Sequence, residues 1–438
     1  MIVSSTIQND LIFPVDNFRA LKEKVLNWIQ QFDTFSFLDN HQYQIEPHTQ
    51  ECLVAAGVKR KVTASSGEAL ISLQNFINEK KDCWLFGNLG YDLKNELELL
   101  ASSHNDHIGF PDLFFFEPEV LIRLNETRMV IDANEPEKIF DQIKNTNIIT
   151  PKLTGGVKIS SRIKKEKYIS IVNELRQHIL RGDCYEINFC QEFFAEHADI
   201  DPLQVYLQLS EISPNPFSAF YRINDKWLIC ASPERYLQKS GSRILSQPIK
   251  GTSKRMHENA REDNESKEKL FLSSKDRAEN VMVVDLVRND LSKICKEGMI
   301  TVDELYSIYS FPQVHQMIST ISGELKKNVS FSEIIRATFP MGSMTGAPKK
   351  RVMELIENYE QTKRGIFSGA IGYISPSGNF DFNVVIRSIL FNATSGYLSY
   401  QAGSGITFYS DAEKEWEECM LKAEAINKVF SVSEKGIN

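Results

Sequence analysis

The sequence has few cysteines, and their spacing argues against two kinds of cysteine-dependent fold. Seven cysteines are scattered over 438 residues, and no two of them form a Cys-x-x-Cys pair. A small disulfide framework uses an even set of cysteines, and a thiolate zinc site uses closely paired ones. Neither is indicated here, so we expect reduced thiols, several of them buried.

Long apolar runs and concentrated positive charge are also missing. No stretch approaches the roughly 20 apolar residues of a membrane-spanning helix, and the first ten residues lack the charged start and apolar run of a secretory leader. The formal charge is −8, without a dense cluster of lysine and arginine. A negative net charge without a basic cluster offers no binding surface for nucleic acid or an anionic membrane. We therefore expect a cytoplasmic protein with no nucleic-acid and no membrane partner.

Internal repeats and low-complexity tracts are absent as well. What the chain does contain is 42% hydrophobic and 10% aromatic residues, which is enough to bury a large core. Strand-like and helix-like segments alternate in clusters, an order that favours an α+β fold over a doubly wound sheet. Helical spacing of apolar residues predicts a helix over 16–32, and a second helix is expected over 165–180.

The stretch 145–161 is the best candidate for a boundary within the chain. It is polar and contains one proline and two adjacent glycines, which interrupt regular structure. The boundary would separate an N-terminal region, residues 1–150, from a catalytic region, residues 151–438, with the first region intertwined with the rest.

Lys250 lies two residues after a proline and directly before a glycine, in the segment 246–252. A rigid proline and a permissive glycine let the backbone approach a ligand closely, with an ammonium held over it. Taken alone, the pattern is more typical of a solvated loop lysine. Glu234 stands beside Arg235, and taken alone it would be half of an ordinary ion pair.

Two acidic pairs predict a metal site. Asp276 with Glu279, and Glu415 with Glu418, are each three residues apart, so each pair presents two carboxylates on one helix face. In isolation such a pair is more typical of a solvated acidic face. Apolar residues share both faces at helical offsets, so both should turn inward, and buried carboxylates need a cation or hydrogen-bond donors. Oxygen ligands without a nearby His or Cys suit Mg²⁺ better than zinc.

A glycine-rich turn, residues 342–348, precedes an expected helix that starts near Lys349. Free backbone N–H groups at a helix start favour anions, and the proline that ends the turn suits a first helical position. The turn is not a Walker motif, because the Gly-x₄-Gly-Lys-Ser/Thr spacing is absent. An arginine can hold a carboxylate with two hydrogen bonds, and glycines let backbone N–H groups approach it. The candidate anion-binding residues are Ser343, Thr345, Arg387, Gly403 and Gly405.

Taken together and in this order, the motifs resemble the chorismate-utilising enzymes, and within them the aminodeoxychorismate synthase component I group. The likeness runs from about residue 159 to 429, and its most specific segments are 248–252, 276–280, 285–290 and 342–349. The resemblance implies an α+β fold of two facing antiparallel sheets flanked by helices, as in anthranilate synthase component I, with the active site deep between the sheets.

The resemblance also implies a reaction, the amination of chorismate at C4 to 4-amino-4-deoxychorismate for para-aminobenzoate and folate synthesis. Lys250 would add at C2 as a nucleophile while Glu234, as general acid, protonates the departing C4 hydroxyl. Ammonia would then enter at C4 and expel the lysine. Burial should raise the pKa of Glu234 and lower the pKa of Lys250, which suits both roles.

The same resemblance assigns ligands and contacts. It implies Mg²⁺, with Glu279 and Glu418 as direct ligands and with Asp276 and Glu415 acting directly or through water. Such an ion holds a substrate carboxylate and neutralises charge at the reacting ring. His315 and Tyr373 match substrate-contacting positions of the family, although His315 alone would be interpreted as a satisfied core residue.

Ammonia is expected from a separate glutamine amidotransferase subunit, because the chain has no Gly-x-Cys-x-Gly nucleophile elbow. Two alternatives stay open. One is anthranilate synthase component I, although anthranilate-forming relatives carry Ala where Lys250 stands; isochorismate- and salicylate-forming relatives match less well. The other is a non-catalytic scaffold for the glutaminase.

The chain departs from the family pattern at a few places. Glu186 stands where the family usually has Gln, and residues 407–410 differ from the usual run. We expect neither departure to touch the proposed chemistry directly. Residues 35–39 resemble the tryptophan-binding segment of relatives only loosely, and no tryptophan site is assigned from them.

Overall fold

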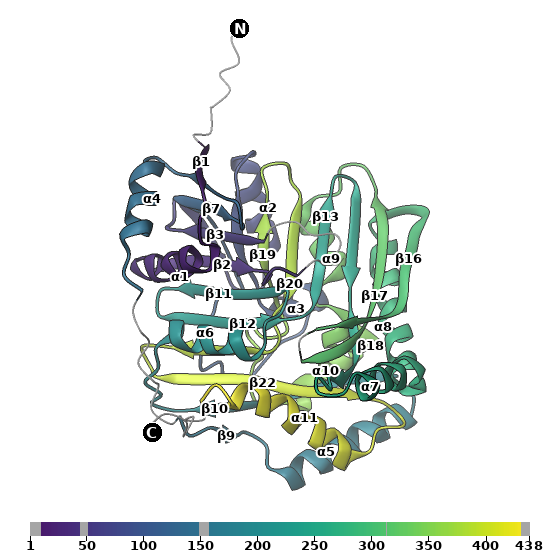
Figure 1. The fold of residues 1–438 in the computed structure, drawn as a ribbon. Coiled ribbons are helices and arrows are strands. Elements are labelled where there is room, and N and C mark those ends of the chain that lie inside the picture. The colour runs from purple at the N-terminus through teal and green to yellow at the C-terminus, as the bar shows by residue number, and fades with distance from the viewer. Residues whose placement is uncertain (1–9, 44–50, 149–156, 312, 431–438) are drawn as a thin grey trace, which may run out of the picture.

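Two antiparallel sheets form the frame of the molecule (Figure 1). The computed structural model describes residues 10–43, 51–148, 157–311 and 313–430. Within these residues one sheet has twelve strands and the other has ten. The expectation of an α+β fold with two facing antiparallel sheets is confirmed, since one hydrophobic core draws its residues from both sheets.

The first sheet combines strands from early and late parts of the chain. In spatial order its strands are β1 (Asp10–Pro14), β8 (Arg128–Asp132), β7 (Val120–Leu124), β3 (Cys52–Ala56), β2 (Thr34–Asp39), β11 (Phe217–Ile223), β12 (Lys226–Ser232), β21 (Ser388–Asn392), β22 (Tyr397–Ile406), β10 (Glu186–Ala195) and β18 (Gly346–Ala347), with β9 (Ser160–Ser161) beside β10.

The second sheet is built in the same mixed way. Its strands are β15 (Ile249–Lys254), β17 (Val314–Leu325), β14 (Arg243–Gln247), β13 (Arg235–Ser240), β20 (Phe380–Val384), β19 (Ala370–Ile374), β5 (Leu85–Leu89), β6 (Leu113–Glu117) and β4 (Arg60–Ala64), with β16 (Cys295–Ser310) beside β17.

The first sheet is covered on both faces. In β3, Leu53 and Ala55 belong to the core between the sheets, whereas Val54 and Ala56 belong to a second core under the outer helices. A strand that is buried on both sides reads as a continuous apolar run rather than an alternating one. The sequence Cys-Leu-Val-Ala-Ala of β3 has that property.

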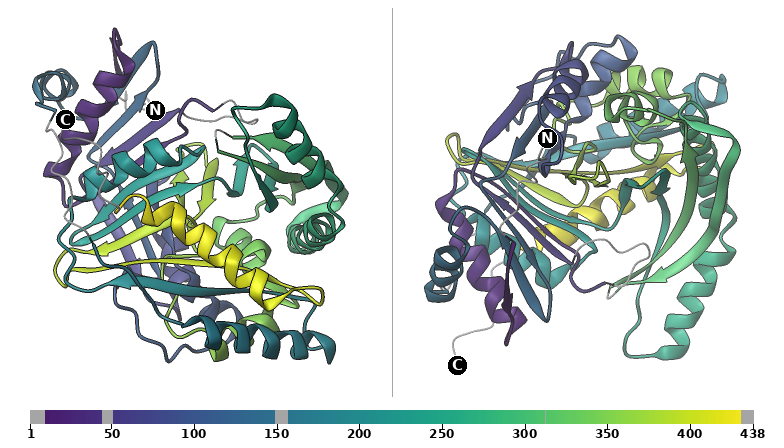
Figure 2. Two further views of the ribbon diagram at one scale, coloured as in Figure 1. Left: turned by 60° about the horizontal axis from the view of Figure 1, so that its bottom comes forward. Right: turned by 90° about the horizontal axis from the view of Figure 1, so that it is seen from above.

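Helices pack outside the sheets, as the two views of Figure 2 show. The helices that contribute buried residues to the second core are α1 (Phe18–Trp28), α4 (Pro136–Asn145), α5 (Lys165–Leu180), α6 (Pro202–Ile212), α10 (Lys349–Tyr359) and α11 (Ala412–Asn427). The helices that contribute to the core shared by the two sheets are α2 (Ala69–Glu79), α8 (Ser274–Ser292) and α9 (Phe331–Thr338). Two further helices are α3 (Lys94–Glu98) and α7 (Ala260–Leu272).

The expected helices are present, with small shifts at their ends. The helix expected over 16–32 is α1, whose N-terminal cap Asn17 accepts a hydrogen bond from the backbone N–H of Ala20, and it ends in a short 3-10 turn, η1 (Ile29–Gln31). The helix expected over 165–180 is α5. Pro348 is the capping residue before α10 rather than its first helical residue.

The division near residue 150 stays a prediction. Strands from both sides of it enter both sheets. Residues 149–156 of the expected boundary lie outside the described residues, as do residues 1–9. All seven cysteines are free, and six are buried. No helix in the described ranges is long and apolar enough to cross a bilayer.

Two crossings between the sheets lie side by side. The chain passes from β12 in the first sheet to β13 in the second through Glu234, and from β20 in the second to β21 in the first through Arg387. Backbone hydrogen bonds join the crossings, from Ala231 N–H to the Arg387 carbonyl and from Val384 N–H to the Glu234 carbonyl. The fold therefore places an acidic residue and an arginine next to each other where the chain crosses between the sheets.

Candidate active site

Lys250 lies in β15, at an irregular point of the second sheet. The register of β15 against β17 shifts between Ile249 and Thr252, and Gly251 has a φ of 92°. A β-bulge of this kind turns a side chain out of the regular ladder. A Cβ on Gly251 would lie 3.0 Å from the Asp276 side chain, so glycine also lets β15 approach α8 closely. The expected close approach of this backbone to a ligand stays a prediction.

The direct partner of Lys250 is Glu186, the first residue of β10. Lys250 Nζ donates a hydrogen bond to Glu186 Oε1 over 2.5 Å, and the two residues are only 9% and 1% exposed. A Cβ on Gly405 would lie 2.6 Å from that oxygen and 3.1 Å from Nζ, so the glycine of β22 leaves room for this pair. The expectation that Glu186 stays clear of the proposed chemistry is wrong.

The carboxylates around Lys250 also correct the expected direction of its pKa. Burial lowers the pKa of the Lys250 ammonium, but the charges of Glu186, Glu279 and Glu234 raise it, and the net direction is upward. The sequence suggested burial alone. It gave no sign that three acidic residues from separate elements surround the lysine.

Burial acts on the pKa of Glu234 in the expected direction. The residue is 4% exposed, and burial raises its pKa to about 7 against the opposing effects of the Ser343 hydrogen bond and the Lys250 charge. Ser343 Oγ donates to Glu234 Oε1 over 2.5 Å. Arg235, the expected ion-pair partner under the simpler interpretation, instead pairs with Asp381 at 3.0 Å. Glu234 is therefore held by a neutral donor and can carry a proton near neutral pH.

Arg387 faces the same charges. Burial lowers its pKa to about 10, while the Glu234 carboxylate raises it. Its guanidinium forms no ion pair with any residue in the described ranges, and its backbone is held in the left-handed region at a φ of 50°. A bulky residue in that region is strained, and such strain is often found at ligand sites. Arg387 is suited to receive an anionic ligand.

The glycine-rich turn contributes less uniformly than expected. Ser343 lies in the short helix η3 (Gly342–Met344) and contacts Glu234. The Thr345 hydroxyl instead donates to the Met341 carbonyl and serves the turn itself. A Cβ on Gly403 would meet the Phe189 carbonyl at 1.9 Å, which places this glycine at the close pairing of β22 with β10.

His315 and Tyr373 are not brought to Lys250 by their described contacts. His315 is 1% exposed, and its two ring nitrogens contact Ser310 Oγ at 2.9 Å and Asp263 Oδ1 at 3.2 Å. This agrees with the simpler interpretation of a satisfied core histidine. The Tyr373 ring packs against Trp84 at 5.5 Å between ring centroids. Their assigned substrate contacts stay predictions.

Gln316 is a candidate that sequence reasoning missed. It lies on β17 opposite Thr252 of β15 and is fully buried. Both amide atoms lack a hydrogen-bond partner among the described residues, although a buried amide without partners is costly. Strand alternation could have indicated it, because Gln316 faces the opposite side of β17 from His315.

The four predicted metal ligands lie on α8 and α11. Lys275 Nζ lies 3.2 Å from Glu415 Oε1 and 3.8 Å from Glu279 Oε1, and so bridges the two helices. Glu279 Oε1 and Glu415 Oε2 are buried without a hydrogen-bond partner. Burial raises the pKa of Glu279 to about 7. Buried carboxylate oxygens without donors need positive charge nearby, and Lys275 supplies part of it in this structure. Such oxygens are also the ligands that a hard metal ion prefers.

The ligand set is not closed, however. Glu418 is half exposed and pairs with Lys422 at 2.8 Å, and Lys422 together with Lys275 holds its pKa below its usual range despite burial. No three carboxylate, histidine or cysteine side chains in the described part of the chain gather as a metal site. Asp276 faces Gly251. The magnesium assignment therefore remains a prediction.

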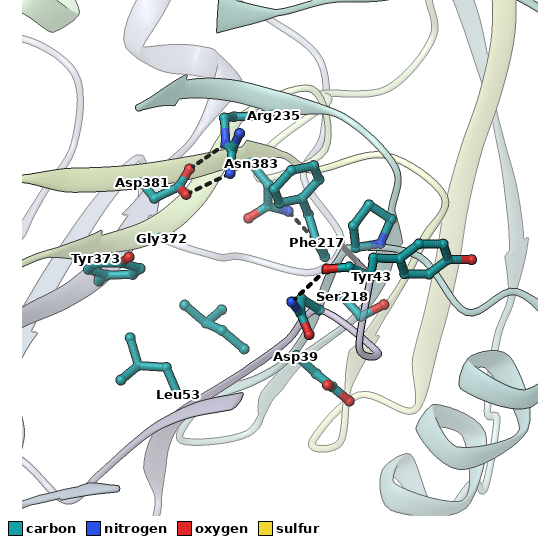
Figure 3. Close-up of a pocket in the computed structure, with 13 residues that line it drawn as sticks. Asp39, Tyr43, Leu53, Phe217, Ser218, Arg235, Gly372, Tyr373, Asp381 and Asn383 are labelled. Atoms are coloured by element: carbon teal, nitrogen blue, oxygen red, sulfur yellow. Dashed lines mark hydrogen bonds and ion pairs between the residues drawn. The ribbon is translucent and has the colours of Figure 1, made fainter. Parts of the chain in front are cut away.

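A separate cavity lies between the two sheets and is shown in Figure 3. Its lining residues include Leu38 and Asp39 from β2, Phe217 from β11 and Tyr373 from β19. Arg235 and Asp381 face it from the second sheet and are joined by two hydrogen bonds of 3.0 and 3.2 Å. This cavity places Tyr373 in a different environment from the cluster of Lys250, Glu186 and Glu234.

Comparison with known proteins identifies the family of this chain. The family described as chorismate binding enzyme matches residues 33–428. Aminodeoxychorismate synthase component 1 of Escherichia coli K12 is 38% identical over 355 residues, which cover 80% of this chain and 76% of that protein. An anthranilate synthase component I-like protein of Synechocystis is 35% identical over 350 residues, covering 78% and 71%.

A solved structure agrees with these sequence matches. The crystal structure of anthranilate synthase component I from Streptococcus pneumoniae TIGR4 has a TM-score of 0.76 at 25% identity and covers 88% of this chain and 94% of that one. The extent of the family match and the identity to the E. coli protein lead to one assignment: the chain belongs to the chorismate binding enzymes.

Proposed function

We propose that this chain aminates chorismate at C4 to give 4-amino-4-deoxychorismate, as a component I subunit of para-aminobenzoate synthesis. The observation that carries the proposal is the buried cluster of Lys250, Glu186 and Glu234, in which the amine donates to Glu186 and interacts through charge with the protonatable carboxyl of Glu234. Its relative from E. coli bears the corresponding name at 38% identity.

The proposed reaction divides the work between these groups. Lys250 adds to C2 of the ring, the two ring double bonds shift, and the C4–O bond breaks. Glu234 gives its proton to the departing oxygen, which leaves as water; its pKa of about 7 keeps that proton available at neutral pH. Ammonia then attacks C4, the double bonds shift back, and Lys250 leaves.

Binding follows from charge. Chorismate is a dicarboxylate, and the Arg387 guanidinium can hold one carboxylate with two hydrogen bonds. Glu279, Glu415, Glu418 and Asp276 would hold Mg²⁺, which when bound attracts the other carboxylate and offsets the charge of the acidic cluster. The buried site excludes water, which would otherwise compete with ammonia for the ring.

Ammonia would come from a glutamine amidotransferase partner. The cysteine closest to a nucleophile elbow is Cys184, and burial raises the pKa of its thiol to about 11. A thiol that is protonated at neutral pH is a poor nucleophile. The chain is therefore expected to use free ammonium on its own and glutamine only with the partner, in the cytoplasm where chorismate and reduced thiols coexist.

Product identity tests the proposal. The purified chain, chorismate, Mg²⁺ and ammonium should yield a non-aromatic amino dicarboxylate without pyruvate, as identified by chromatography and mass spectrometry. Replacing ammonium by glutamine should stop the reaction. Stoichiometric anthranilate and pyruvate would assign the chain to the rival enzyme, and no turnover at all would favour the scaffold.

A further inference from the structure

Glu186 is a buried carboxylate that uses only half of its hydrogen-bonding capacity. It is 1% exposed, and Oε1 accepts the hydrogen bond from Lys250 Nζ. Its other oxygen, Oε2, is buried without a partner among the described residues. Leaving a charged oxygen unsatisfied in the interior is unfavourable, so this arrangement calls for a reason other than stability.

Another buried ion pair in the same molecule can be compared with the pair of Glu186 and Lys250. Arg364 and Glu360 are also almost fully buried. Glu360 Oε1 accepts from Arg364 Nη2 at 2.6 Å and from the backbone N–H of Cys190 at 2.9 Å, and Oε2 accepts from Arg364 Nε at 2.9 Å. Both oxygens are satisfied there. The pair of Glu186 and Lys250 lacks this completeness.

The chemistry proposed above leaves a proton without a destination. Lys250 is held as an ammonium, and an ammonium has no lone pair with which to form a bond. Glu279 and Glu234 act on Lys250 through their charge, but among the described residues Glu186 is the only carboxylate within ion-pair distance of Nζ. Glu234 already accepts the Ser343 hydrogen bond and is assigned as the acid.

We propose, on the basis of the proposed function, that Glu186 positions the Lys250 amine and accepts its proton as the amine adds to the substrate. One N–H bond of the ammonium breaks and an O–H bond forms on Glu186, which frees the nitrogen lone pair. That pair forms the N–C2 bond, and the electrons displaced through the ring leave with the C4 oxygen, which takes the Glu234 proton. The proton on Glu186 returns to the lysine when ammonia expels it.

The variant Glu186→Gln isolates the proton transfer. Glutamine keeps the shape and can still accept the lysine hydrogen bond, but it cannot take the proton. Loss of the charge also removes one of the effects that raise the pKa of Lys250. The proton must then leave to solvent, so the rate of adduct formation relative to wild type should become strongly dependent on pH. General-base catalysis contributes about 10²-fold or more, which sets the expected loss at pH 7.

The experiment measures the covalent adduct itself, in single turnovers without ammonia, by intact-protein mass spectrometry from pH 6 to 9. Omitting ammonia keeps its own titration out of the profile. The wild-type rate should fall as the pH rises above about 7, because Glu234 then loses the proton that the leaving oxygen needs. Glu186→Gln should be about 10²-fold slower than wild type at pH 7, with the ratio of the two rates recovering as the pH rises, and Glu186→Asp, which keeps a carboxylate, should retain the wild-type profile at a lower rate.

A matched control removes another buried charge from the same strand. Glu192 on β10 pairs with Arg162 at 2.7 Å, and Glu192→Gln should leave the pH profile of the adduct unchanged. If Glu186→Gln matches wild type in rate and profile, or if Glu192→Gln shows the same change, the role of Glu186 is refuted. If wild type forms no adduct, the proposed function fails first, so the two failures are distinguishable.

Discussion

At Lys250, burial and charge act in opposite directions, and charge prevails. A buried lysine alone would lose its proton readily, whereas one surrounded by Glu186, Glu279 and Glu234 keeps it. The residue is therefore stored as an ammonium and must be activated when substrate arrives. Substrate carboxylates and a bound cation would both change the local field.

The nucleophilic role of Lys250 has a direct test. With chorismate and Mg²⁺ but no ammonia, a peptide containing Lys250 should gain the mass of the dehydrated substrate. Lys250→Ala should abolish the adduct and lower C4 amination by about 10²-fold or more. It could also divert residual amination to C2, which would then be free.

Lys254 provides the control on the same strand. It is exposed near the end of β15, and Lys254→Ala should keep both adduct and turnover. If Lys250→Arg retained most activity and no adduct formed in any ammonia-free condition, Lys250 would be a source of charge only, and the covalent route would be withdrawn.

Residue-level prediction succeeded where local chemistry was enough. The raised pKa of Glu234 follows from its burial. Glu186 failed, because β10 and β15 belong to different sheets and no sequence pattern shows that their ends meet. The contact depends on the long-range arrangement of the strands.

At the scale of elements, α8 and α11 form the acidic side of the site. Both acidic pairs lie on helices, and Glu279 is buried as expected. The expectation that the face of Glu418 turns inward is wrong, because Glu418 is partly exposed and Leu421 on the same face is 68% exposed; Glu415 is the buried member of that pair. Lys275 was not anticipated as the link between the helices. It neutralises part of the cluster in the free protein, which helps to explain how two helices with inward carboxylates can approach each other.

A cation that binds between α8 and α11 must compete with Lys275. Glu279→Gln and Glu418→Gln should each raise the Mg²⁺ concentration needed for half-maximal turnover by at least about tenfold. The circular dichroism spectrum should stay unchanged. Each substitution removes the charge of one carboxylate and leaves the side-chain volume almost unchanged.

The neighbour Glu417 is exposed on α11, so Glu417→Gln serves as the control and should titrate with Mg²⁺ as wild type does. Full activity of wild type in excess chelator would contradict the metal assignment, whatever the variants show.

At the scale of the molecule, the fold places two chain crossings next to each other and puts charged groups at both. Composition and the clustering of segments indicated α+β, and the resemblance supplied the two facing sheets. The region before residue 150 was expected to be intertwined with the rest, but the sequence did not indicate which of its strands enter each sheet, because strand order depends on contacts between distant residues. The same crossings bring Glu234 and Arg387 together.

Placing ionisable groups between two sheets should reduce the stability of the whole chain in a pH-dependent way. The pKa of Glu234 rises from 4.5 to about 7 on burial. Between these values the native state holds more protons than the unfolded state, so stability falls as the pH rises. At a pH above both values the cost is roughly 3 kcal/mol.

Glu234→Gln should therefore raise the free energy of unfolding by about 1 to 3 kcal/mol at pH 8 and by much less at pH 4.5, while it abolishes the acid function. Urea unfolding at the two pH values measures the difference. Glu297, which is exposed, supplies the control, since Glu297→Gln should change stability little at either pH. Equal stabilisation by Glu234→Gln at both values would mean that the carboxyl stays protonated throughout, or that glutamine improves packing, and the stated cost of the catalytic acid would be wrong.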